Sequence, residues 1–221
     1  IEYILNYKYK RQTPYKSTIN VLDIEPASAT ASITKNNVRK WLGLTEVGDE
    51  NLKSERKRGT IKSFCCEETS GEGAAHAKNM LDGNDSTYWH SRWSLNKETG
   101  PHWFEYKLSP EDSKRKLKGF HYVARPNTNG YANGKPLTLD VQMYDEANTL
   151  LYEEKNIKMT ESGSVSELNQ WIEKDVKFKK PVKNVSYIKV IFTDAYNNEV
   201  SDKHSAAYAT CAEFSTLYTD N

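Results

Sequence analysis

The loop LDGNDST, residues 81–87, places several oxygen donors close together in the chain. Asp82, Asn84 and Thr87 offer carboxylate, amide and hydroxyl oxygens around a glycine, and calcium takes such ligands at flexible geometry. An Asx turn, in which Asp and Asn side chains bond to their own backbone, would use the same residues. The spacing does not fit an EF-hand loop, because no acidic residue stands where its bidentate Glu belongs. Taken alone, the loop is compatible with an ion site and with a turn.

Aromatic residues and a histidine follow this loop, at Trp89, His90 and Trp93. A ring nitrogen beside a flat apolar face offers a sugar directed hydrogen bonds and a surface for its C–H groups. The alternative is that one or both tryptophans belong to the core, and for Trp89 we favour the core. The spacing by itself is only a weak indication of a sugar pocket.

The composition argues against several kinds of partner. The chain has 221 residues, 37% hydrophobic and 28% charged, as is common in soluble globular proteins. Its 31 basic residues nearly balance its 30 acidic ones, so no overall field attracts nucleic acid or an anionic membrane. No apolar run approaches the ~20 residues that cross a bilayer, and the first residues lack the pattern of a signal peptide. We expect a globular protein with neutral partners, either cytosolic or exported by a signal that this sequence does not contain.

No catalytic motif emerges from the spacing of reactive residues. His76, His90 and His102 lack the spacing of a zinc enzyme, and no Ser-His-Asp or Cys-His nucleophile signature is evident. A catalytic carboxylate pair is not identifiable among 30 acidic residues without geometry. We therefore expect no catalysis by this chain, although a longer parent protein would be free to carry it.

Three cysteines leave the redox compartment open. Cys65 and Cys66 are adjacent and would close a strained ring if joined. Cys211 is able to pair with one of them, but we favour buried free thiols.

From about residue 100 onward, aromatic and β-branched residues alternate with polar ones in short runs. Alternation at period two is typical of antiparallel strands with one face on the core and one in water. It predicts strands at residues 102–108, 117–125, 136–144, 149–154, 174–180, 186–194 and 211–218. These strands and the long polar loops between them predict an all-β sandwich or barrel with binding residues on its end loops.

Residues 1–60 have a different pattern. They contain two candidate strands and a candidate short helix, and they end in the charged connector GDENLKSERKRGT. We place a domain boundary near residue 60 and expect residues 1–60 to form an amino-terminal extension or small domain of unknown function. KSERKR is expected to be solvated linker, because Glu55 interrupts its positive charge.

Several segments in a fixed order resemble the coagulation factor 5/8 type C, or discoidin, domain. They are SFCCEETSGEGAAHAKNMLDGNDSTYWHSRW, GPHWFEYKLS, KLKGFHYVARPN, NGKPLTLDVQMYDE, SYIKVIFTDA and AAYATCAEFSTLY. The resemblance covers about residues 61–221. Within the discoidin family, the sequence resembles the carbohydrate-binding module family 32 branch most specifically. It implies a galactose-binding-like β-sandwich, or jelly roll, which agrees with the strand pattern.

The resemblance also implies a structural Ca2+ ion. The family's ligand positions fall on Asn79, through its backbone oxygen, and on Asp82, Asn84, Thr87 and Glu213, with the carbonyl of Ala212 as a sixth donor. Such an ion would join the two ends of the domain and stabilise the fold by linkage without touching the ligand. With the resemblance included, we favour the ion site over the simple turn at residues 81–87.

Sugar-binding members of the family gather a His, an Arg, an Asn, an acidic residue and aromatic rings at the loop end of the sandwich. The matching positions are His90, Arg125, Asn133 or Asn129, Glu72, Trp93 and Tyr208. Asn133 is preferred to Asn129 because NGK leads directly into the next strand. Arg125 would bond adjacent hydroxyls with its fork, while His90 or Glu72 accepts and an aromatic ring desolvates the apolar face of the sugar. An axial hydroxyl reached by His90 and Arg125 would distinguish galactose from glucose.

The predicted function is non-catalytic binding of carbohydrate, with terminal galactose or N-acetylgalactosamine as the expected ligand. The resemblance places it on a secreted or surface bacterial protein, extracellular or periplasmic. The alternative is a protein- or phospholipid-binding discoidin domain involved in adhesion. Membrane insertion is disfavoured, because the end loops carry Asn, Gly, Thr and Tyr where a lipid-binding domain carries apolar spikes.

Overall fold

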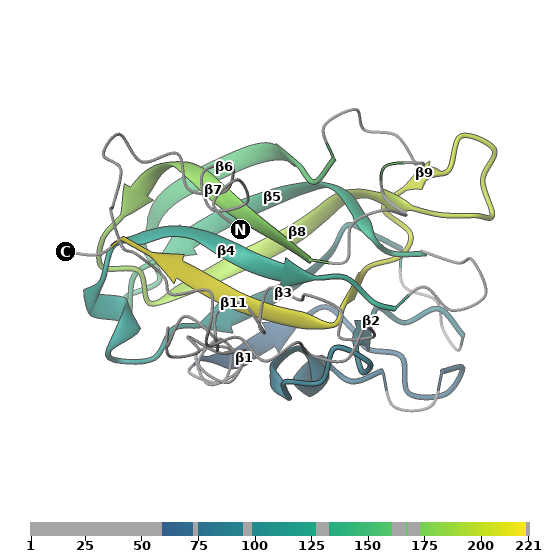
Figure 1. The fold of residues 1–221 in the computed structure, drawn as a ribbon, viewed down its shortest axis with the longest axis horizontal. Helices are drawn as coiled ribbons and strands as arrows, with labels where there is room; N and C mark the ends of the chain where they lie inside the picture. The colour runs from purple at the N-terminus through teal and green to yellow at the C-terminus, as the bar shows by residue number, and fades with distance from the viewer. Residues whose placement is uncertain are drawn as a thin grey trace, which may run out of the picture. The chain divides into compact units, whose positions relative to one another are not determined.

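Antiparallel strands make up most of the described chain (Figure 1). This computed structural model describes residues 59–72, 75–94, 99–126, 133–160, 167 and 173–219, all within one compact unit of residues 47–221. The predictions for residues 1–58 and for Asn129 fall outside the described residues. Within the described residues, no helix is both long enough and apolar enough to cross a bilayer.

Two sheets carry the fold. The larger has the order β1 (Thr60–Phe64), β3 (His102–Lys107), β8 (Tyr187–Tyr196), β5 (Pro136–Tyr144) and β6 (Leu150–Lys158), and β9 (His204–Ser205) pairs with β8. The smaller has the order β11 (Glu213–Tyr218), β4 (Leu117–Val123) and β7 (Glu173–Val182). β10 (Thr210–Cys211) pairs with β2 (Trp89–His90), and the 3-10 helices are η2 (Ala77–Leu81) and η3 (Asp112–Lys114).

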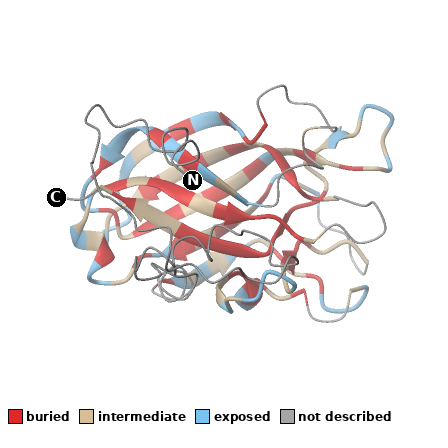
Figure 2. Cartoon of the chain, viewed as in Figure 1, coloured by how far each residue is buried: buried red, intermediate tan, exposed pale blue. Residues whose placement is uncertain are grey.

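The alternation of apolar and polar residues accounts for the sandwich. In β3 and β5, buried residues alternate with partly exposed ones, so one face of each strand points inward. Figure 2 shows buried residues, in red, along the strands of both sheets. Phe214 of the smaller sheet packs on Phe104 and Tyr106 of the larger, with ring centroids 5.0 and 5.4 Å apart. The all-β sandwich and the seven predicted strands are confirmed.

Trp89 is fully buried and contacts Phe104 and Phe192 edge-on, so its predicted place in the core is confirmed. Its Nε1 donates to the carbonyl of Cys66 at 2.9 Å. Cys65, Cys66 and Cys211 form no disulfide bond with one another. Cys66 and Cys211 are buried, as predicted, whereas Cys65 is only partly buried.

Strand ends bring the candidate site together. β2 pairs with β10 through His90 and Thr210, and the Tyr122 hydroxyl of β4 donates to the carbonyl of Thr210. Arg125 follows β4 by two residues. The two-residue strand β2 was not predicted, because a run of two residues has no detectable period. The strand predicted at residues 211–218 is divided between the end of β10 and β11.

Candidate functional site

Arg125 occupies the centre of the predicted sugar site, just beyond the end of β4. Its Nη2 donates hydrogen bonds to Oε1 of Glu72 and to the hydroxyl of Tyr88, both at 3.3 Å. Its Cζ lies 4.5 Å from the centroid of the Tyr88 ring, in a cation–π arrangement. Arg125 is only 7% exposed. A buried guanidinium held by a carboxylate and a ring has one orientation, and its fork still carries donors for a ligand.

His90 presents an acceptor close to this guanidinium. It is buried, and its Nδ1–H donates to the carbonyl of Ser91 at 2.7 Å. That bond leaves the lone pair of Nε2 as an acceptor. Burial, together with the positive charge of Arg125, lowers the pKa of His90 to about 3. The imidazole is therefore neutral near neutral pH, so the site combines a neutral acceptor with a charged donor.

Two aromatic rings flank His90. The centroid of Trp93 lies 6.4 Å from that of His90, and Tyr208 meets His90 edge-on at 5.8 Å. Tyr208 is buried, whereas Trp93 is partly exposed. Trp93 rests on Gly71, where an added Cβ would lie 2.6 Å from Cζ2 of the indole. Trp93 thus has exposed surface for a ligand, while Tyr208 backs His90.

Glu68 fastens two loops of the site to each other. Its carboxylate accepts backbone N–H bonds from Ser70, Gly71, Trp93 and Ser94 at 2.7 to 2.9 Å, and the Ser94 hydroxyl donates to it at 2.6 Å. Burial opposes its ionisation, but these hydrogen bonds outweigh burial and hold the pKa of Glu68 well below its usual range. A permanently charged carboxylate therefore positions the segments that precede Glu72 and follow Trp93.

Sequence reasoning missed both Glu68 and Tyr88. Glu68 stands next to Glu67 and close to Glu72, and nothing local distinguishes the three carboxylates. Tyr88 directly precedes Trp89 and His90, and no sequence pattern marks its side chain as part of the site. The role of Tyr88 becomes evident only in the fold, which places the Arg125 guanidinium over its ring.

The side chain of Asn133 is engaged with Asn198. Its Nδ2 donates to Oδ1 of Asn198 at 2.8 Å, and its Oδ1 accepts from the backbone N–H of Asn198 at 2.9 Å. Its carbonyl accepts from the hydroxyl of Thr210 at 3.5 Å, so it lies beside the strand that pairs with His90. The geometry joins Asn133 to the loop after β8 and leaves its role as a sugar ligand a prediction.

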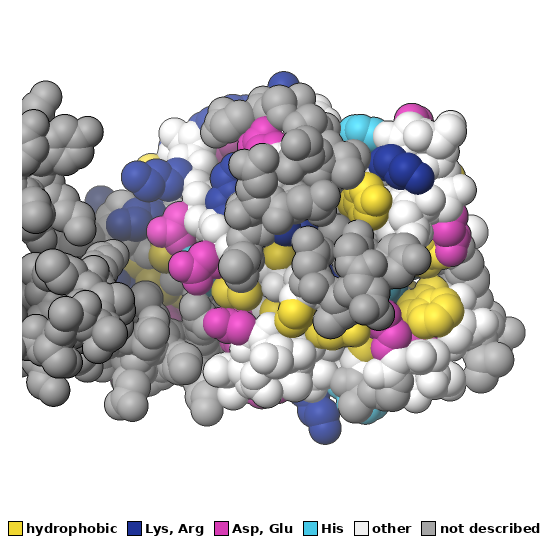
Figure 3. Space-filling view, turned by 45° about the vertical axis from the view of Figure 1, so that its right-hand side comes forward, with side chains coloured by type: hydrophobic (Ala, Val, Ile, Leu, Met, Phe, Trp, Pro, Cys, Tyr) yellow, Lys and Arg dark blue, Asp and Glu magenta, His cyan; other side chains and the backbone are white. Residues whose placement is uncertain are grey.

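Three buried polar atoms of the site have no hydrogen-bond partner within the described part of the chain. They are Oε2 of Glu72, Nε of Arg125 and Nε1 of Trp93. Buried polar groups are nearly always hydrogen-bonded, so each such atom calls for an explanation. One acceptor and two donors among the residues of the predicted site suit a ligand whose groups both donate and accept. Figure 3 turns the loop end toward the viewer and shows hydrophobic side chains at its surface among charged and polar ones.

The loop of residues 81–87 meets Glu213, as the resemblance implied. The buried carboxylate of Glu213 accepts the backbone N–H of Gly83 at 2.6 Å and that of Asn84 at 3.0 Å. Asp82 accepts the N–H of Asn84 at 2.8 Å and the hydroxyl of Thr87 at 2.6 Å. The bond within the loop from Asp82 is that of an Asx turn, so the turn is formed.

The remaining predicted calcium ligands border the same loop. The carbonyl of Asn79 accepts the N–H of Asp82 at 3.4 Å, and Ala212 directly precedes Glu213. Gly83 has a φ of 77°, a left-handed conformation that glycine adopts without strain. All donors are oxygens and two are carboxylates, which is the donor chemistry of a hard cation such as Ca2+.

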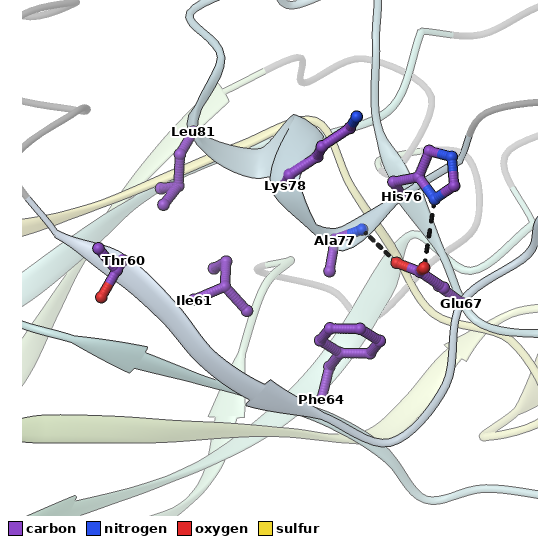
Figure 4. A pocket seen from close by; sticks show the side chains of 8 residues that line it. All are labelled: Thr60, Ile61, Phe64, Glu67, His76, Ala77, Lys78 and Leu81. Atoms are coloured by element: carbon purple, nitrogen blue, oxygen red, sulfur yellow. Dashed lines mark hydrogen bonds and ion pairs between the residues drawn. The ribbon is translucent and has the colours of Figure 1, made fainter.

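A separate groove of about 530 Å³ lies between β1 and η2 (Figure 4). Its lining is mainly apolar and consists of Thr60, Ile61, Phe64, Glu67, His76, Ala77, Lys78 and Leu81. The acidic side chain and the imidazole of this groove pair with each other, since Nδ1 of His76 lies 3.2 Å from Oε1 of Glu67. The directed polar groups that a sugar needs are therefore better supplied around Arg125 than in this groove.

Comparison with known proteins assigns the chain to a family. A profile of the F5/8 type C domain matches residues 63–214, a span that includes every described residue of the predicted sugar and calcium sites. The chain belongs to the F5/8 type C domain family. The predicted resemblance is confirmed.

Solved structures of other proteins share this fold at low sequence identity. A family 32 carbohydrate-binding module from a family 31 glycoside hydrolase of Clostridium perfringens is 18% identical, with a TM-score of 0.56 over 75% of this chain and 94% of that one. A second Clostridium perfringens module, solved in complex with GalNAc-β-1,3-galactose, is 18% identical, with a TM-score of 0.51 over 74% and 97%. These matches support the galactose-binding-like sandwich.

One curated relative of this F5/8 type C chain is a lacto-N-biosidase of Bifidobacterium bifidum. It is 26% identical over 141 residues, which is 64% of this chain but only 12% of that enzyme. The chain thus spans about an eighth of the length of that relative.

Proposed function

We propose that this F5/8 type C domain is a non-catalytic carbohydrate-binding domain and that the cluster of Arg125, His90, Glu72, Tyr88 and Trp93 is its binding site. The observation that carries the proposal is the set of unpaired buried polar atoms on Glu72, Arg125 and Trp93. A sugar hydroxyl donates and accepts at once, so adjacent hydroxyls of one pyranose would satisfy an acceptor and two donors together.

Terminal galactose or N-acetylgalactosamine is the ligand that we propose. A neutral His90 acceptor beside the Arg125 fork suits a hydroxyl that projects from the ring, as the axial hydroxyl of galactose does. The partly exposed Trp93 would cover the C–H face. The similar module solved with GalNAc-β-1,3-galactose motivates the same choice. A single open site predicts weak binding, with a Kd on the order of millimolar to tens of micromolar.

A structural Ca2+ ion is part of the proposal. Asp82, Asn84, Thr87 and Glu213 would hold it, together with the carbonyls of Asn79 and Ala212. Cation binding would replace the hydrogen bonds that Asp82 and Glu213 now accept from the loop. The ion would link the loop before β2 to the start of β11 and so stabilise the domain.

We further propose an extracellular or cell-surface location, in keeping with glycan ligands. Adhesion through protein or phospholipid is the second candidate function. It is less well supported, because the described residues of the site contribute charged and hydrogen-bonding groups instead of exposed aliphatic side chains.

A glycan array tests the proposal, followed by calorimetry with free galactose, N-acetylgalactosamine and glucose. We expect selective binding to glycans with terminal galactose or N-acetylgalactosamine, and at least tenfold weaker binding of glucose. Binding of glucose as tight as that of galactose would refute the galactose assignment. Failure to bind any glycan would refute carbohydrate binding and favour a protein or lipid ligand.

A further inference from the structure

Two cysteines and a histidine lie together where β1 ends and β3 begins. Sγ of Cys65 is 3.4 Å from Sγ of Cys66, and the two sulfurs are 3.5 and 3.7 Å from Nδ1 of His102. Among the described residues, this is the group of three or more His, Cys, Asp or Glu side chains whose ligand atoms come within 4.8 Å of one another. Neither the sugar site nor the calcium loop uses these atoms.

The spacing of the three atoms matches the edges of a tetrahedral metal centre. A zinc ion with Zn–S of about 2.3 Å and Zn–N of about 2.0 Å holds two sulfurs about 3.8 Å apart, and a sulfur and a nitrogen about 3.5 Å apart. The three observed separations differ from these values by a few tenths of an ångström. Only small side-chain rotations would therefore bring all three atoms onto one ion.

The surroundings prepare each atom to act as a ligand. Nε2–H of His102 donates to the carbonyl of Ala207 at 3.0 Å, which fixes the tautomer and directs the lone pair of Nδ1 at the sulfurs. The backbone N–H of Trp103 donates to the sulfur of Cys65 at 3.5 Å, and that of Arg92 donates to the sulfur of Cys66 at 3.3 Å. Such bonds stabilise negative charge on sulfur, as a metal-bound thiolate requires.

Charge and access also suit one divalent ion. Two thiolates, a neutral imidazole and a 2+ ion sum to zero, so the filled site would bury no net charge. Cys66 and His102 are buried, but Cys65 is only half-buried, so solvent reaches the cluster at Cys65 and a water molecule would supply the fourth ligand.

From this geometry we infer that Cys65, Cys66 and His102 bind one Zn2+ ion. The inference does not rest on the proposed sugar function. Its consequence is structural, because the carbonyl of Cys66 accepts from the indole of Trp89 and His102 is bonded to Ala207. These contacts adjoin His90 and Tyr208 in the chain, so a bound ion would brace the strand ends that carry the sugar site.

The test uses the full chain, fully reduced and kept free of oxygen, with Co2+ as a spectroscopic probe. We expect one equivalent of Co2+ to produce thiolate-to-metal charge-transfer absorption and the visible bands of a tetrahedral ion, and Zn2+ to abolish both. We expect Zn2+ to raise the melting temperature as well. Cys65→Ser and His102→Gln should each weaken binding at least tenfold. Cys211→Ser removes a free thiol outside the cluster and is the matched control, which should bind as the unaltered chain does.

Cys65 is only half-buried, so Cys65→Ser should fold normally, and circular dichroism of each variant checks this. The absence of charge-transfer absorption in the reduced protein would overturn the proposal. Equal binding by Cys65→Ser would do the same, because it would place the ion on other residues.

Discussion

The guanidinium of Arg125 lies over the ring of Tyr88, with Cζ 4.5 Å from the centroid, and also donates to the hydroxyl of that residue. Glu72 accepts from the same nitrogen, Nη2. The tyrosine and the carboxylate therefore fix the arginine before any ligand arrives, and ordering its long side chain adds little entropic cost to binding. A preorganised charged donor is the main physical requirement of the proposed sugar site.

Arg125→Lys should weaken galactose binding about 10- to 100-fold, since a hydrogen bond to a charged group contributes about 1.5–3 kcal/mol and lysine lacks the planar fork. Calorimetry measures the change. Arg115→Lys is the matched control, because Arg115 also lies over a tyrosine, Tyr218, with a carboxylate partner, Asp112. A similar loss of affinity in both variants would show that the effect is not specific to the site.

Acid should destabilise the protein through His90. Burial, together with the Arg125 charge, lowers the pKa of His90 to about 3, against an ordinary value of about 6.5 in the unfolded chain. Between those values the unfolded state binds a proton that the folded state does not, so stability falls as pH falls. Urea unfolding at about pH 7, 6 and 5 should show this loss, approaching about 1.4 kcal/mol per pH unit, and His90→Gln should reduce it. A pH profile unchanged by His90→Gln would contradict the prediction.

The low pKa of His90 should keep sugar affinity independent of pH over the range in which it lowers stability. Because His90 stays neutral, its Nε2 remains an acceptor, and affinity should be nearly constant from about pH 7 down to about pH 5. Titrations with galactose across this range measure it. A sharp loss of affinity around pH 6.5 would mean that His90 is protonated at its ordinary pKa.

Glu68→Gln should lower the free energy of unfolding by about 2 kcal/mol, because the amide group would turn a donor toward backbone N–H groups that need an acceptor. Chemical denaturation measures the change. Sugar affinity should fall too, since the loops next to Glu72 and Trp93 would lose their common anchor. Glu153→Gln alters an exposed ion pair with Lys155 and should leave the free energy of unfolding unchanged within experimental error.

Ca2+ should raise the melting temperature, and chelation should reverse the rise, if Asp82 and Glu213 hold the ion. Asp82→Asn keeps the size of the side chain and should abolish most of the shift. Asp145→Asn, in the hairpin turn between β5 and β6, is the control and should preserve it. A melting temperature indifferent to Ca2+ in the unaltered protein would rule out the ion and leave the Asx turn as the full account of this loop.

The sequence by itself determined the fold class and most of the strands. Period-two alternation is a local property of the sequence, and a sheet that buries one face requires it. The strands β3, β4 and β5 could therefore be predicted without any tertiary information. The buried position of Trp89 and the family followed from residue types and their order. The meeting of Glu213 with the loop of residues 81–87 was also anticipated, through the resemblance.

Only the tertiary structure decided which polar groups act together. Glu68 looks like its acidic neighbours until folding surrounds it with backbone N–H donors. Tyr88 gains a role when Arg125 is placed over it, and Asn133 is bound to Asn198, 65 residues away in the chain. Cys65, Cys66 and His102 converge because β1 and β3 are paired. Contacts between residues far apart in sequence arise from the packing of whole sheets, so the local sequence pattern does not predict them.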